Sequence, residues 1–226
     1  MIKKLIKILS IIFLGIILTI LYLSFVGLKS EKFNKKITNK ILEINKNINL
    51  DLNEVKFLLD PYNFTVNIST KNPMVLLGSN KLKIKEIKTN ISLKSLIYNE
   101  FSVDDLQILT NPIKLDDLIL LARSFKNSTE LFLMNSAIKD GFITANIKVK
   151  FDDKGNIKKD YQITGTIKNA KLNFLNRIKV SNLNLEFDIK KSKYTLLEVK
   201  SVINETKLSS QLIEIDQKKD QFLIKG

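Results

Sequence analysis

The pattern of apolar positions changes twice along the chain. From Ile8 to Leu28 the residues are mostly Ile, Leu and Phe, and none is charged. Apolar residues then recur at helical spacing from Phe33 to Ile44, and beyond Ile48 they alternate with polar residues, as in strands with one buried face. The pattern predicts a transmembrane segment over 1–29, an amphipathic helix over 30–46, and a β-rich domain over 47–226.

The apolar run is long enough to cross a membrane. A helix rising about 1.5 Å per residue spans about 30 Å over this run, which is the thickness of a hydrocarbon core. A cleaved signal peptide is the alternative, but its apolar stretch is typically only about 7 to 15 residues long. We therefore expect an uncleaved single-pass anchor. The short basic head, with Lys3, Lys4 and Lys7, favours a cytoplasmic N-terminus.

The segment after the anchor has two interpretations. Ser30 is a suitable N-cap residue, and Phe33, Ile37 and Ile41 share one helical face. Such a helix could lie on the membrane surface as a lid. It could also cap the end of the sheet that follows, and we favour this second interpretation.

Alternation is clearest after Gly141. Ile143, Ile147 and Val149 fall on one side of a predicted strand, and lysine and asparagine fall on the other. The run Asp152–Asn156 has the composition of a hairpin turn. Short helices are predicted over 93–98 and 113–125. The fold class is therefore mostly β: an antiparallel meander with one apolar and one lysine-rich face, and two or three short helices.

Composition narrows the possible chemistry. The chain has no cysteine, histidine or tryptophan, which excludes disulfides, thiolate sites and histidine-based catalysis. Asp152 and Asp153 lack the spaced partners of a calcium loop. We expect no catalytic residues, no cofactor and no metal. A hydrolase that uses carboxylates remains a distant third hypothesis.

The formal charge of +14 does not indicate a nucleic-acid partner. Of the 37 basic residues only Arg123 and Arg177 are arginine, the residue best suited to bidentate recognition of phosphate and guanine. The lysines are spread along the whole chain. Such diffuse charge favours weak attraction to anionic lipid headgroups instead.

Several stretches beyond the anchor share a pattern of small and apolar positions: Ile91–Ile97, Phe101–Val103, Leu106–Ile108, Asn111–Leu115, Gly141–Asp152 and Tyr161–Gly165. With the anchor before them, they resemble the N-terminal region of the AsmA-like family, which includes TamB-type proteins. The resemblance implies a long, curved sheet in an inner-membrane protein of a Gram-negative-type envelope, with its bulk in the periplasm, that carries phospholipid along an apolar groove toward the outer membrane. Family members that span the envelope are several times longer, so we expect the chain to be part of a longer protein.

A groove also has a physical basis, because an apolar sheet face must be covered by protein, membrane or ligand. The alternative is that the same residues form the core of a closed sandwich or pack against the 113–125 helix. A different function would use the final strand, Phe222–Ile224, as an open edge that pairs with an envelope protein while the chain serves as an anchored scaffold. The residues predicted to line a groove for phospholipid acyl chains are Ile143, Ile147, Val149, Ile163, Ile167, Leu183, Leu185 and Phe187.

Overall fold

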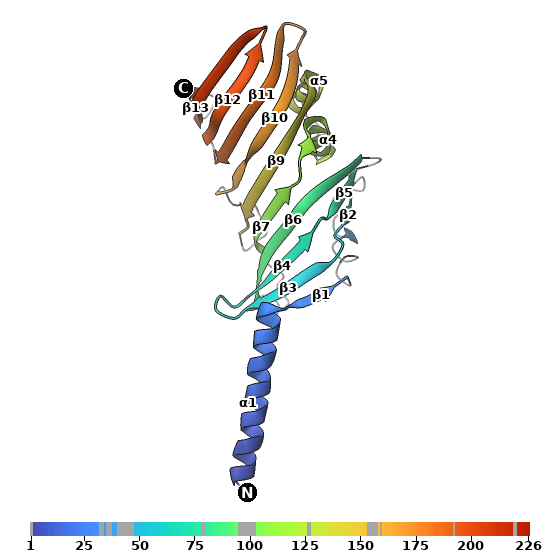
Figure 1. Cartoon of the computed structure of the whole chain (residues 1–226), viewed down its shortest axis with the longest axis vertical. Coiled ribbons are helices and arrows are strands. Elements are labelled where there is room, and N and C mark those ends of the chain that lie inside the picture. Colours follow the sequence, from blue (N-terminus) through green and yellow to red (C-terminus); the bar gives the residue numbers. More distant parts are fainter. Residues whose placement is uncertain are drawn as a thin grey trace.

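The computed structural model is a single antiparallel sheet with one long helix at its end (Figure 1). It describes residues 2–31, 34, 38–39, 48–77, 80–94, 103–125, 128–152, 158, 160–191, 193–218 and 221–226. The sheet has 14 strands in the order β1-β3-β4-β6-β7-β9-β10-β11-β12-β13-β14, with β2, β5 and β8 paired beside this path. The predicted fold class is confirmed.

Helix α1 covers Ile2–Phe25 and is long and apolar enough to cross a membrane. Within Lys3–Phe25, an 18-residue window has a mean hydropathy of 2.6. Gly27 then turns the chain with a φ of 76°. A Cβ at Gly27 would lie 2.3 Å from the Phe57 carbonyl oxygen, so glycine allows the next strand to pair closely with β3.

The segment predicted as a helix over 30–46 begins differently. Ser30 is the last residue of strand β1 and pairs with Val55. Thr38 is helical, and its Oγ1 donates a hydrogen bond of 2.7 Å to the Leu50 carbonyl oxygen, which joins this segment to β2. Most of the predicted helix lies outside the described residues, as do most of the one over 93–98 and the Asp153–Asn156 part of the predicted turn.

Most neighbouring strands are joined by short connections, as expected for a meander. The strands are β1 (Leu28–Ser30), β2 (Ile48–Asp51), β3 (Val55–Asp60), β4 (Thr65–Lys71), β5 (Met74–Leu77), β6 (Asn80–Ser92), β7 (Val103–Thr110), β8 (Ile113–Lys114), β9 (Ile138–Lys150), β10 (Gln162–Phe174), β11 (Ile178–Lys190), β12 (Lys193–Ile203), β13 (Thr206–Lys218) and β14 (Gln221–Lys225).

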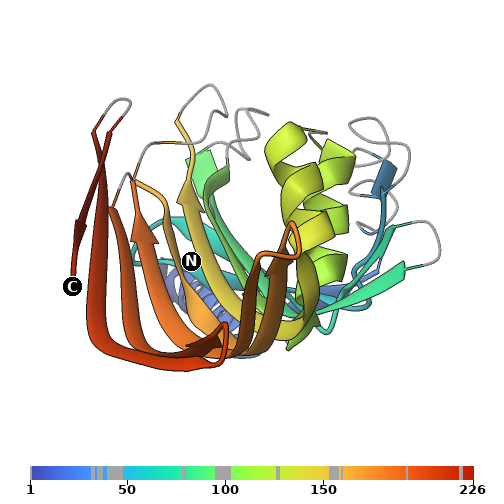
Figure 2. The same ribbon diagram turned by 90° about the horizontal axis from the view of Figure 1, so that it is seen from above.

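The sheet is curved into a trough when seen along its long axis (Figure 2). Residues with positive φ interrupt neighbouring strands: Asn169 in β10, Asn182 in β11 and Glu198 in β12. The register shifts close to each of them. A β-bulge bends its strand and increases the local twist, so these adjacent bulges account for the curvature.

Two helices stand inside the curve of the sheet (Figure 2). Helix α4 (Leu115–Phe125) corresponds to the predicted 113–125 helix. Its Leu118 and Leu121 pack on a buried cluster that includes Leu82 and Ile113. Helix α5 (Thr129–Ala137) follows, capped at its start by Ser128. The contacts of both helices with the sheet lie mainly on β8, β9 and β10.

Candidate functional site

A row of apolar residues runs along the trough, across the strands. It begins beside the cluster under α4, where Ile87, Ile108 and Leu118 pack against the same buried residues, and this contact places the row on the concave face. Each member is the direct cross-strand partner of the next. The row consists of Ile87, Ile108, Ile147, Ile163, Ile189, Tyr194, Ile215 and Ile224.

The length of this row matters for what it could bind. It crosses from β6 to β14, and seven steps of about 4.8 Å between strands give about 34 Å. Half of a bilayer's hydrocarbon core is about 15 Å thick. The row is therefore about twice as long as the depth that one acyl chain spans in a bilayer.

A second row lies beside the first and is packed more tightly. Gly165 pairs with Ala145 on one side and Phe187 on the other. A Cβ at Gly165 would lie 2.7 Å from Phe187 Cζ, so the aromatic ring occupies the space left by the missing side chain. Phe187 is consequently buried, with 8% of its surface exposed. The row continues through Leu196 and Ile213.

The eight residues predicted to line a groove all lie on strands β9, β10 and β11. By alternation and register they share the concave face. Ile143 packs in the cluster under α4, so at this residue the alternative of packing against the helix describes the structure. Leu183 pairs with Ala170 at the line of bulges. Ile147 and Ile163 belong to the long row. Val149, Ile167 and Leu185 are partly exposed on the same face, and Phe187 is buried in the second row.

The concave face is not sealed by the part of the chain that the structure describes. Ile147, Ile163, Ile189, Tyr194 and Ile215 all remain partly exposed to solvent. At the far end of the long row, Ile224 is 65% exposed. In a closed sandwich such residues would be buried, so the interpretation as a sandwich core does not fit the described strands.

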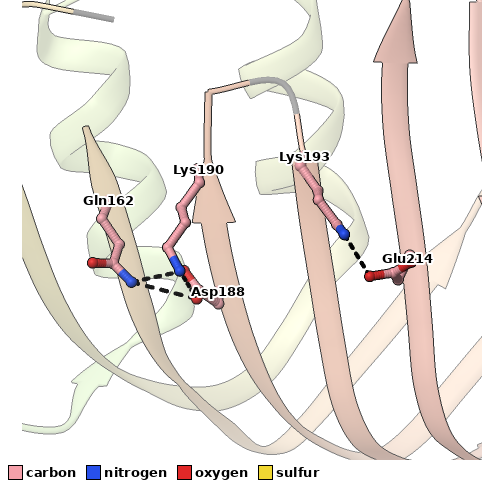
Figure 3. A network of polar contacts seen from close by, with 5 residues as sticks. All are labelled: Gln162, Asp188, Lys190, Lys193 and Glu214. Atoms are coloured by element: carbon pink, nitrogen blue, oxygen red, sulfur yellow. Dashed lines mark hydrogen bonds and ion pairs between the residues drawn. The ribbon is translucent and has the colours of Figure 1, made fainter. Parts of the chain in front are cut away.

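The convex face carries the polar residues of the same strands. Gln162 Nε2 donates to both carboxylate oxygens of Asp188, at 3.1 and 3.3 Å, and Lys190 Nζ lies 2.7 Å from Asp188 Oδ2 (Figure 3). Lys193 Nζ lies 2.6 Å from Glu214 Oε1. The Gln162–Asp188 and Lys193–Glu214 contacts join neighbouring strands, and such cross-strand pairs stabilise the sheet without burying charge.

These contacts shift the pKa values of the acidic side chains. Burial raises the pKa of Asp188, but hydrogen bonds from Lys190 and Gln162 outweigh it, and the pKa lies below its ordinary value. The hydrogen bond from Lys193 lowers the pKa of Glu214, and the same bond raises the pKa of Lys193. Asp188, Glu214 and Lys193 therefore stay charged at neutral pH, and the convex face stays solvated.

Sequence reasoning missed one strand of the site. Strand β12 contributes Tyr194 and Leu196 to the concave face through their pairing with Ile189 and Phe187. The alternation within β12 shifts by one residue at the bulge at Glu198, which has a φ of 50°. A strict two-residue period therefore fails there. The run Tyr194–Leu196, taken alone, would have indicated the strand.

Among the described residues, no group of three or more acidic, histidine or cysteine side chains is placed to hold a metal ion. On the convex face, Asp188 and Glu214 are instead paired with lysines. Comparison with protein-family models, curated proteins and solved structures finds no match to this chain.

Proposed function

We propose that the chain is a membrane-anchored envelope protein whose concave sheet face shields or conducts phospholipid acyl chains. The observation that carries this proposal is the partly exposed apolar row from Ile87 to Ile224 along a trough whose outer face is polar. Transfer of acyl chains from water onto such a surface releases about 0.8 kcal/mol per CH2 group. No polar contact with the headgroup is required.

The anchor belongs to the same proposal. Helix α1 has an exposed apolar surface along its length, and its end packs against β3. A helix that is part of the folded domain's contacts is better explained as a retained anchor than as a removed signal peptide. With the N-terminus in the cytoplasm, the sheet would lie in the periplasm, where it would contribute to phospholipid transport and outer-membrane biogenesis, as the AsmA-like resemblance implies.

The proposal is tested by charge substitutions on adjacent residues of one strand. Ile163 lies in the long row, and Thr164 lies on the convex face opposite Asp188. Phospholipid that stays bound to the purified full-length chain is counted by native mass spectrometry. We expect Ile163→Lys to reduce bound lipid at least about tenfold, which corresponds to about 1.4 kcal/mol, and Thr164→Lys to leave it unchanged.

Equal lipid content in both variants would contradict the proposal. Thermal melts followed by circular dichroism separate loss of the site from loss of the fold. If Ile163→Lys unfolds the sheet, the same measurement is made with Ile224→Lys instead. Ile224 is 65% exposed, so its substitution leaves the core intact.

A second candidate function is a scaffold that pairs with a partner protein by strand addition. It is favoured by β14, which among the described strands pairs only with β13 and whose residues are all exposed. An exposed edge offers unpaired backbone groups to another strand. If Leu223→Pro abolishes a protein complex while bound lipid is absent from the wild type, the scaffold replaces the lipid function.

A further inference from the structure

The turn between β3 and β4 lies beside the end of α1, at the junction of helix and sheet (Figure 1). A pocket of about 510 Å³ lies between the turn and the end of α1. This size is within the range of about 300–1,000 Å³ that is usual for small-molecule sites. The walls are mostly apolar and come from the last turns of α1 and the two arms of the turn, among them Ile20, Leu21, Phe25, Leu58 and Tyr62.

The turn is held in a fixed shape by Asp60. Its Oδ1 accepts hydrogen bonds of 3.1 Å from the backbone N–H groups of Tyr62 and Asn63, and its Oδ2 accepts one of 2.8 Å from Asn63 Nδ2. The side-chain and backbone hydrogen bonds from Asn63 lower the pKa of Asp60. The carboxylate therefore stays charged and keeps the turn ordered.

The fixed turn carries two exposed aromatic side chains. Tyr62 is 94% exposed and Phe64 is 71% exposed. Phe64 also has a φ of 52°, where glycine or asparagine is usual and a bulky side chain is strained. Neither exposure nor strain stabilises the fold, so the two aromatic residues are better explained by a partner that covers them.

Two observations favour lipid as the partner. Ile20, Leu21 and Phe25 of α1 line the pocket and are exposed, so the pocket is continuous with the apolar surface of the helix. Tyr62 is an aromatic residue with one polar end, a type that is enriched where a membrane meets water.

We propose that the β3–β4 turn is a second membrane contact, in which Tyr62 and Phe64 insert into the interface of the bilayer that α1 crosses and a phospholipid of that bilayer fills the pocket. The inference rests on the anchor in the proposed function but not on the trough. Its consequence is a fixed orientation: two contacts, helix and turn, hold the sheet at one angle to the membrane.

The absence of tryptophan from the chain allows a direct test with single tryptophan reporters. The full-length chain with Tyr62→Trp is reconstituted into vesicles of phosphatidylethanolamine and phosphatidylglycerol, a fraction of which carries bromine at a shallow acyl position. Leu175→Trp is the matched control, because Leu175 is 85% exposed and has a φ of 50°. It belongs to the turn between β10 and β11, and this turn lies far from α1 (Figure 1).

We expect the Tyr62→Trp chain to show blue-shifted emission and bromine quenching that is several-fold stronger than in the Leu175→Trp chain. Adding Phe64→Asn to the Tyr62→Trp chain should weaken this quenching without lowering the melting temperature, because asparagine accepts the positive φ. A purely structural role for Phe64 predicts the opposite pair of results.

A third reporter, Leu14→Trp in the middle of α1, separates this inference from the anchor. If deep bromines quench the Leu14→Trp chain and the Tyr62→Trp chain emits as in water, the anchor stands and the membrane contact of the turn is refuted. If neither chain is quenched, both the anchor and the inference fail.

Discussion

At the residue scale, packing on the concave face depends on Gly165, because glycine has no side chain. A Cβ there would lie 2.0 Å from the Thr144 carbonyl oxygen and 2.7 Å from Phe187 Cζ. The first contact is with backbone and cannot be relieved by a rotamer change. Glycine at this position therefore leaves room for the Phe187 ring to lie on the concave face beside the long row.

We expect Gly165→Ala to lower the free energy of unfolding by about 1–3 kcal/mol, the usual cost of forcing extra volume into a packed site. Urea denaturation of the full-length chain measures the change. Gly15→Ala is the control, since a Cβ at Gly15 meets nothing within 4 Å. Equal stability of the two variants would show that the ring is not packed as described.

The positions of the β-bulges could not be predicted from the residues that form them. Asn169 and Asn182 adopt positive φ values of 53° and 51°, a conformation that asparagine tolerates. Asparagine, however, is common throughout this chain, so its presence marks no particular position. Glu198 carries no such signal at all. The curvature of the sheet was therefore predicted only as a family resemblance, and its cause became visible in the backbone.

At the scale of elements, the spacing of apolar residues predicted the helices and strands in which these residues recur at a regular interval. The helix predicted over 113–125 is α4, Leu115–Phe125, and its Leu115 and Ile119 are buried, as one face of an amphipathic helix should be. Helix α5 was missed because its apolar residues Leu131–Met134 are consecutive and have no helical period. A consecutive apolar run does not distinguish helix from strand.

The two helices should respond differently to truncation. Ile119 on α4 is 7% exposed, whereas Leu133 on α5 is 55% exposed. We expect Ile119→Ala to cost about 2–5 kcal/mol of unfolding free energy and Leu133→Ala less than about 0.5 kcal/mol. Chemical denaturation compares them. A large loss from Leu133→Ala would mean that α5 is covered by protein and does not present an open apolar surface.

At the scale of the whole molecule, alternation predicted that the sheet has one apolar and one polar face. It did not predict which part of the apolar face the helices would cover. That coverage depends on the cross-strand register, which aligns Ile87 through Ile224 into one row, and on where the bulges bend the strands. Both are long-range properties, and residue spacing within one strand does not contain them.

The central claim is that acyl chains lie against the concave face only. Strand β12 offers a matched pair: Leu196 faces Phe187 and Ile213 in the trough, and its neighbour Leu197 pairs with Glu186 and Leu212 on the convex face. A photoreactive amino acid is placed at either position of the full-length chain, which is irradiated in native membranes. We predict phospholipid adducts at position 196 and none at position 197. Equal labelling at both positions, or adducts at position 197 alone, would contradict the account.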